Sequence, residues 1–245
     1  MAGAACRTDG GFQPLLMLGK MPSRLTPGIR ARHNDGMDTD NLLDLIGAAR
    51  ATLDETYRAR EVALSHGRAL TRTCANAIRA MHRGEMDEAR LALDGAQAEA
   101  ARVSEALAGH PDLFFAGYVQ DAHKELAEAA VLLALLTETP LPAPEVLGIQ
   151  TAAYLNGLAE AASEGRRHAL DCLRRGDTIR AEAMLGRMDD ILSALTTVDY
   201  PDAVTGGLRR TCDGLRAVVE RTRGDVTMAV LQNRFVHALP GERAT

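Results

Sequence analysis

The sequence predicts an all-α protein, an antiparallel bundle of six to seven long helices. Three observations support this fold class. Ala and Leu dominate the 46% of residues that are hydrophobic, a composition that favours helices packed through small side chains. No alternation of Val, Ile or Thr persists long enough to predict a strand. From Asp38 onward, apolar residues recur at helical spacing instead.

Capping residues and helix breakers divide this periodic part into elements. Asp40 is expected to cap a helix that runs to about His82, with a weak point at Gly67, and Gly84 ends it. The segment 139–144 contains three prolines and is predicted to be a loop. Further helices are expected over residues 86–107, 112–137, 145–174, from 177 to before Pro201, and from 202 to 235.

Residues 1–36 differ in character from the rest of the chain. They contain Gly, Pro and Arg without helical period, so either they form a disordered extension or translation starts at Met37. The second reading is slightly favoured, because the periodic sequence begins just after that residue. Residues 37–245 are expected to form one helical domain.

Cysteine spacing and apolar run length indicate the cellular compartment. The four cysteines are too far apart for a C-x-x-C site and indicate no disulfide framework, so we expect reduced thiols in a cytoplasmic protein. No apolar run reaches the roughly 20 residues that a membrane-spanning helix needs, so no membrane partner is expected.

The segment from Lys124 to Leu136 carries two carboxylates within an apolar helix. At helical spacing, Glu125 and Glu128 share one side with Leu132 and Leu135, and the opposite side carries no charge. A helix that is apolar all round is normally buried, and buried carboxylates are costly unless something compensates them. A divalent cation would do so, and Mg²⁺ or Mn²⁺ prefers oxygen ligands.

The second half of the chain contains several unusual stretches. They are Tyr-Leu-Asn-Gly-Leu-Ala-Glu at 154–160, Glu-Gly-Arg-Arg at 164–167, Arg-Gly-Asp at 175–177, Asp-Tyr-Pro-Asp-Ala-Val-Thr at 199–205 and Arg-Gly-Asp-Val-Thr at 223–227. In this order and spacing, over about residues 40–230, the chain resembles the translin family. The resemblance is strongest to prokaryotic members related to translin-associated factor X (Trax).

This resemblance implies a translin-like helical protomer that forms homo-oligomers, typically octameric shells, and binds single-stranded RNA or DNA inside them. Trax-type members are divalent-metal-dependent endoribonucleases. Translin-type members bind nucleic acid but lack a complete carboxylate site. Both activities therefore stay open for this chain.

The resemblance also implies site residues. The Trax-type Glu-x-x-Glu pair matches Glu125 and Glu128 in both spacing and helix. Further acids of the family come from a Gly-Asp turn, but the expected aspartate position holds Ile179 here. The remaining candidates for catalysis or metal binding are therefore Asp177 at that turn, Glu182 on the next turn, and the pair Glu160 and Glu164 on the preceding helix.

Arginine supplies nearly all the positive charge, since Lys20 and Lys124 are the only lysines. The net charge of −5 argues against a generally basic nucleic-acid binder but allows a local basic surface. Helix-dipole complementation and ion pairs between subunits would explain the arginines equally well. The candidate phosphate contacts are Arg166, Arg167, Arg174, Arg175, Arg209 and Arg210.

The sequence therefore predicts a single-stranded nucleic-acid-binding protein with Mg- or Mn-dependent endoribonuclease activity. The alternatives are a non-catalytic translin-like binder and a helical adaptor, which would have no use for buried carboxylates. His123 is expected on the surface, and no histidine is expected near the acidic site. Metal-activated water is accordingly expected as the nucleophile rather than imidazole base catalysis. With aromatic residues at only 3%, weak sequence selectivity is expected.

Overall fold

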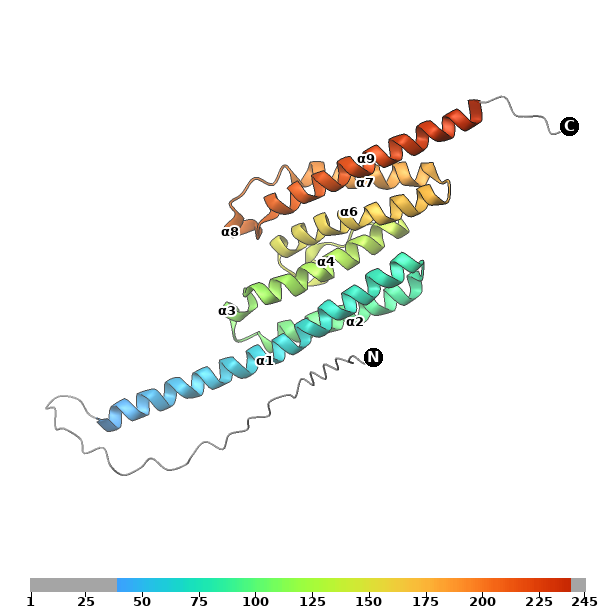
Figure 1. The fold of residues 1–245 in the computed structure, drawn as a ribbon. Coiled ribbons are helices and arrows are strands. Elements are labelled where there is room, and N and C mark those ends of the chain that lie inside the picture. Colours follow the sequence, from blue (N-terminus) through green and yellow to red (C-terminus); the bar gives the residue numbers. More distant parts are fainter. Residues whose placement is uncertain (1–38, 239–245) are drawn as a thin grey trace, which may run out of the picture. The chain divides into compact units, whose positions relative to one another are not determined.

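The computed structural model describes residues 39–238, and the regular structure of this part is entirely helical (Figure 1). The long helices are α1 (Thr39–Arg83), α2 (Met86–Ala106), α4 (Gly117–Thr137), α6 (Thr151–Arg174), α7 (Thr178–Leu195) and α9 (Leu208–Ala238). The short helices α3 (Pro111–Phe114), α5 (Pro144–Leu147) and α8 (Asp202–Thr205) lie in the connections. The predicted all-α fold class is confirmed.

The chain divides into two units at residue 46. Of the first unit, only residues 39–46 are described, and they are helical with exposed side chains. The predicted extension, residues 1–36, lies outside the described part. The second unit begins at Gly47 and contains the other described residues. No helix in the described range is long and apolar enough to span a membrane.

Three of the predicted helices are interrupted in the structure: 112–137 is split into α3 and α4, 145–174 into α5 and α6, and 202–235 into α8 and α9. Helix α1, by contrast, continues through its predicted weak point at Gly67, where a Cβ would make an ordinary contact, 3.9 Å from the Cβ of Ala122. Gly148, with φ of +67°, ends α5 after one turn, since glycine adopts this left-handed conformation at little cost.

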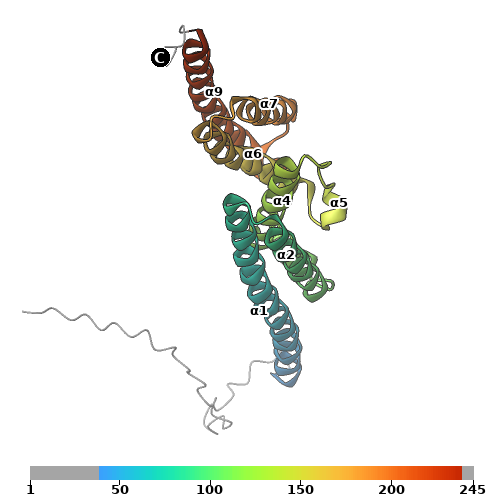
Figure 2. The same cartoon turned by 90° about the vertical axis from the view of Figure 1, so that its right-hand side faces the viewer.

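Helix α4 lies between two apolar clusters (Figure 2). On one side, Leu126 packs with Leu70 and Cys74 of α1 and with small residues of α2. On the other side, Leu132 packs into the core formed with α6, α7 and α9. Burial on both sides explains why the sequence of α4 is apolar all round.

This position of α4 also corrects the expectation for His123. Its side chain is fully buried rather than on the surface, and its ring lies edge-on to Phe114 at 5.7 Å between centroids. Burial lowers the pKa of the imidazole to about 4, because the charged form would be poorly solvated. His123 is therefore neutral at physiological pH.

Candidate metal centre

Gly157 allows α6 to approach α4 closely. A Cβ at this position would lie 2.5 Å from the carbonyl oxygen of Lys124 and 2.6 Å from the Cβ of Ala127. A glycine inside a helix costs about 1 kcal/mol relative to alanine, so its presence here is explained by the close contact. The two helices run in the same direction (Figure 1), and Glu160, one turn beyond Gly157, faces the carboxylates of α4.

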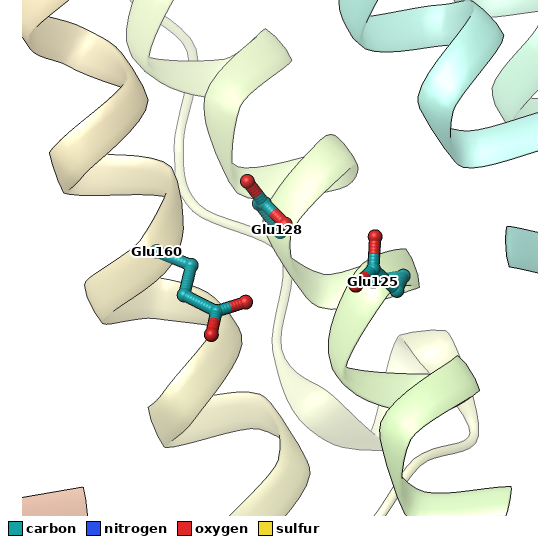
Figure 3. A group of neighbouring side chains, drawn as sticks. All are labelled: Glu125, Glu128 and Glu160. Atoms are coloured by element: carbon teal, nitrogen blue, oxygen red, sulfur yellow. The ribbon is translucent and has the colours of Figure 1, made fainter. Parts of the chain in front are cut away.

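Three glutamates meet at this contact (Figure 3). Glu125 and Glu128 project from α4, and Glu160 projects towards them from α6. One carboxylate oxygen from each lies within 4.8 Å of the others, and all three side chains are half-buried. Two oxygens bound on opposite sides of one Mg²⁺ ion are about 4.2 Å apart, so the three carboxylates need to close by only about 0.6 Å to share an ion.

The electrostatics of the cluster also suit a cation. Burial, and after it the charges of Glu125, Glu160 and Glu164, raise the pKa of Glu128 to about 8. Burial likewise raises the pKa of Glu125, with Glu160 adding to the shift and Lys124 opposing it. Within residues 39–238, the one cationic side chain paired with the three glutamates of the cluster is Lys124, whose Nζ donates to Glu160 Oε1 at 2.8 Å. A bound divalent ion would relieve this repulsion, and the all-oxygen donor set fits a hard cation.

Glu164 lies one turn beyond Glu160 on α6 and is held from α1. The Nε2 of His82, whose side chain is 8% exposed, lies 2.8 Å from Glu164 Oε2. The expectation that no histidine lies near the acidic residues is therefore wrong. No local pattern indicates this contact, because 82 residues separate the two partners.

The other acidic candidates lie elsewhere. Asp177 is the N-cap of α7 and accepts a hydrogen bond from the backbone N–H of Arg180 at 3.0 Å. Glu182 is exposed on α7. Among the described residues, neither belongs to the group of converging carboxylates.

Four of the six candidate arginines are engaged within the chain. Arg166 donates to Thr222 and pairs with Asp225 of α9, which ties α6 to that helix. Arg174 pairs with Asp171, Arg209 pairs with Asp199, and Arg175 contacts the sulfur of Cys172. Arg167 and Arg210 are exposed.

Two hollows border the acidic cluster. A cavity of about 680 Å³ lies at the beginning of α4 and α6, and Lys124 and Glu160 form part of its wall. A second hollow of about 490 Å³ lies between α1 and α4, and Glu125 and Asp121 line it together with Arg68 and Arg72. The cluster is thus accessible from both sides of α4.

Comparison with known proteins identifies the family. The chain is 30% identical over 176 residues to the uncharacterized protein MJ0175 of Methanocaldococcus jannaschii, covering 71% of this chain and 77% of that protein. It superimposes on the crystal structure of AfC3PO with a TM-score of 0.71 and 31% identity, covering 76% of this chain and 97% of that one. The chain belongs to the translin family.

Two further structures bear on this translin-family protein. AfC3PO in its complex with duplex RNA matches with a TM-score of 0.70 at 31% identity, again over 76% of this chain and 97% of that chain. NeC3PO without ligand matches with a TM-score of 0.67 at 19% identity, over 76% and 96%, which shows a shared fold. No family model matches the sequence.

Proposed function

We propose that this protein binds single-stranded nucleic acid and cleaves RNA internally with the help of Mg²⁺ or Mn²⁺. The observation that carries the proposal is the convergence of Glu125, Glu128 and Glu160 from two helices within 4.8 Å. The relative AfC3PO, which has been solved with duplex RNA, supports nucleic acid as the ligand class.

Glu125, Glu128 and Glu160 would hold the cation, with Glu164 one turn away from Glu160. When bound, the cation would activate water and stabilise charge on the leaving oxygen. Lys124 keeps the Glu160 carboxylate oriented through its 2.8 Å hydrogen bond, and His82 does the same for Glu164. Because the pKa of Glu128 is about 8, this side chain holds a proton at neutral pH until a cation displaces it.

We also propose that the protein assembles into a homo-oligomer, with an octamer as the form that the family resemblance implies. Exposed apolar side chains support association. In the second unit they include Leu53 and Tyr57 on α1, exposed by 67% and 60%, and Met228 on α9, exposed by 58%. Light scattering coupled to size-exclusion chromatography would give the mass. A monomer at micromolar concentration would contradict this part of the proposal.

The test of the enzymatic function is the incubation of labelled single-stranded RNA with Mg²⁺ or Mn²⁺. Glu125→Ala should lose more than about 100-fold in cleavage rate, because loss even of the outer partners of metal ligands costs 10–100-fold. Asp177→Asn and Glu182→Gln are matched controls that remove acidic groups outside the cluster, and we expect both to keep activity.

Three results would change the proposal. Equal cleavage by wild type and Glu125→Ala would remove the assigned site, and loss of activity in Asp177→Asn alone would move it to the start of α7. Binding of RNA without cleavage by the wild type would establish the alternative, a non-catalytic translin-like binder. A parallel reaction with duplex RNA tests the preference for single strands.

A further inference from the structure

The cavity beside the acidic cluster has the size and lining of a ligand site. Its volume of about 680 Å³ lies within the roughly 300–1,000 Å³ range of small-molecule sites. Its wall is partly apolar, from Phe115, Ala152 and Val204, and partly polar, from Gln120, Asn156 and Thr211. Glu160 of the acidic cluster lies in this wall, and so does Lys124, which donates a hydrogen bond to it. A molecule that fills the cavity therefore lies directly beside the proposed metal centre.

Phe115 is an aromatic side chain that remains exposed at this cavity. It is 62% exposed, and the Phe114 ring stands perpendicular to it at 5.4 Å between centroids. The chain has only four phenylalanines in 245 residues, so an exposed one at the edge of a cavity stands out. An exposed aromatic face offers a flat apolar surface on which a nucleobase can stack.

Hydrogen bonds hold Asn156 and Thr211 of the polar wall in place. The Nδ2 of Asn156 donates to the carbonyl oxygens of Ala152 and Thr205, and Thr211 Oγ1 donates to Asn156 Oδ1 at 2.7 Å. These bonds join α6, α8 and α9 around the cavity. The shape of the wall is thus fixed before any ligand binds, which lowers the entropic cost of binding.

The turn that carries Phe115 is also fixed to α4. Gln120 Nε2 donates to the carbonyl oxygen of Phe114 at 2.9 Å. Gln120 lies one turn before Lys124 on the same helix. The position of the aromatic ring is therefore coupled to the helix that carries Glu125 and Glu128.

We propose that this cavity is a nucleotide subsite, which binds the nucleotide next to the phosphodiester that is cleaved at the acidic cluster. The base stacks on Phe115, and the sugar and phosphate extend towards Lys124 and Glu160. This inference rests on the proposed function, because it needs a nucleic acid at the cluster. Stacking accepts every base, so the subsite confers little sequence preference.

The first test measures the affinity of the purified protein for a fluorescent single-stranded RNA in the presence of a chelator, so that no cleavage occurs. Phe115→Ala should bind on the order of 5- to 100-fold more weakly, the range that loss of one stacked base gives. Phe115→Tyr keeps the ring and should bind within about twofold of wild type. Phe235→Ala removes an equally exposed phenylalanine, 74% exposed on α9, and should bind like wild type.

The second test uses short RNAs in which each position in turn lacks its base. At the position that occupies the cavity, removal of the base should weaken binding to wild type but not to Phe115→Ala, because the partner of that base is already gone. Equal losses in both proteins at every position would overturn the subsite. An unchanged affinity of Phe115→Ala, or an equal loss in Phe235→Ala, would do the same.

The wild type separates the two proposals. If it neither binds nor cleaves RNA, the proposed function itself is wrong. If it binds and cleaves RNA with Mg²⁺ or Mn²⁺ while Phe115→Ala behaves identically, the function stands and only the subsite is wrong. Because Phe115 is exposed, Phe115→Ala should fold like wild type, and equal melting temperatures of the two proteins would exclude misfolding as the cause of lost affinity.

Discussion

Replacing Gly157 with alanine would test the helix contact that brings the carboxylates together. The new methyl group would lie 2.6 Å from the Cβ of Ala127, whereas nonbonded carbons normally stay about 3.5–4.0 Å apart. Helix α6 would therefore have to move away from α4 by roughly 1 Å. Two of the three nearest atoms are backbone atoms of Lys124 and Glu128, so no change of rotamer can make room.

The expected cost follows from two opposing effects. Overpacking of this kind costs about 1–3 kcal/mol, while alanine in place of glycine stabilises a helix by about 1 kcal/mol. Because backbone atoms block the methyl group, we expect the upper end of the range and a net loss of about 2 kcal/mol. In a domain of this size, that corresponds to a melting temperature lower by about 4–8 °C.

Urea denaturation of Gly157→Ala beside Gly186→Ala would measure this cost. Gly186 lies inside α7, and a Cβ there would meet nothing within 4 Å, so its replacement should be neutral or stabilising. Mn²⁺ affinity should also fall in Gly157→Ala, because Glu160 moves away from Glu128. If Gly157→Ala were as stable as Gly186→Ala, the close contact and the placement of Glu160 that depends on it would be refuted.

Three further predictions concern protonation, thiol reactivity and the core. The folded state raises the pKa of Glu128 to about 8, so the free energy of unfolding, measured by urea titration in a chelator, should fall as the pH rises from about 5 to 8. An equal dependence of this free energy on pH in wild type and Glu128→Gln would contradict this. Cys74 is fully buried, and burial together with the charges of Glu125 and Glu128 raises its pKa to about 12. Mass-spectrometric mapping at pH 8 should therefore find Cys74 alkylated only after unfolding, and rapid labelling in the native protein would contradict this. Leu132→Ala should lower the free energy of unfolding by about 2–5 kcal/mol, because Leu132 is fully buried in the core, and a loss below 1 kcal/mol in urea denaturation would show that its burial is wrongly assigned.

Local patterns in the sequence were sufficient for three of the six predicted helices. Capping residues and breakers predicted α1, α2 and α7 to within a few residues, and the prolines at 140, 142 and 144 predicted the loop after α4. The break between α5 and α6 was missed because its signal is a single glycine, Gly148, in a segment of otherwise helical composition. Gly67 carries the same signal, yet α1 continues through it.

The site was harder to predict because it depends on how α4 and α6 align. The spacing of Glu125 and Glu128 is local and readable, but which acid of α6 faces them depends on the contact at Gly157. A glycine inside a predicted helix, three residues before Glu160, was the available signal. His82 and Glu164 are 82 residues apart, and nothing local connects them. The roles of Glu160, Asp177 and the arginines in function stay predictions.

The central claim is that the carboxylates of α4 and α6 hold one divalent cation together. Titration of the metal-free protein with Mn²⁺, followed by electron paramagnetic resonance of the free ion, measures this directly. Wild type should bind at least one Mn²⁺ per chain, while Glu128→Gln and Glu160→Gln should each bind at least about tenfold more weakly. Equal Mn²⁺ affinity of wild type and both variants would contradict the account.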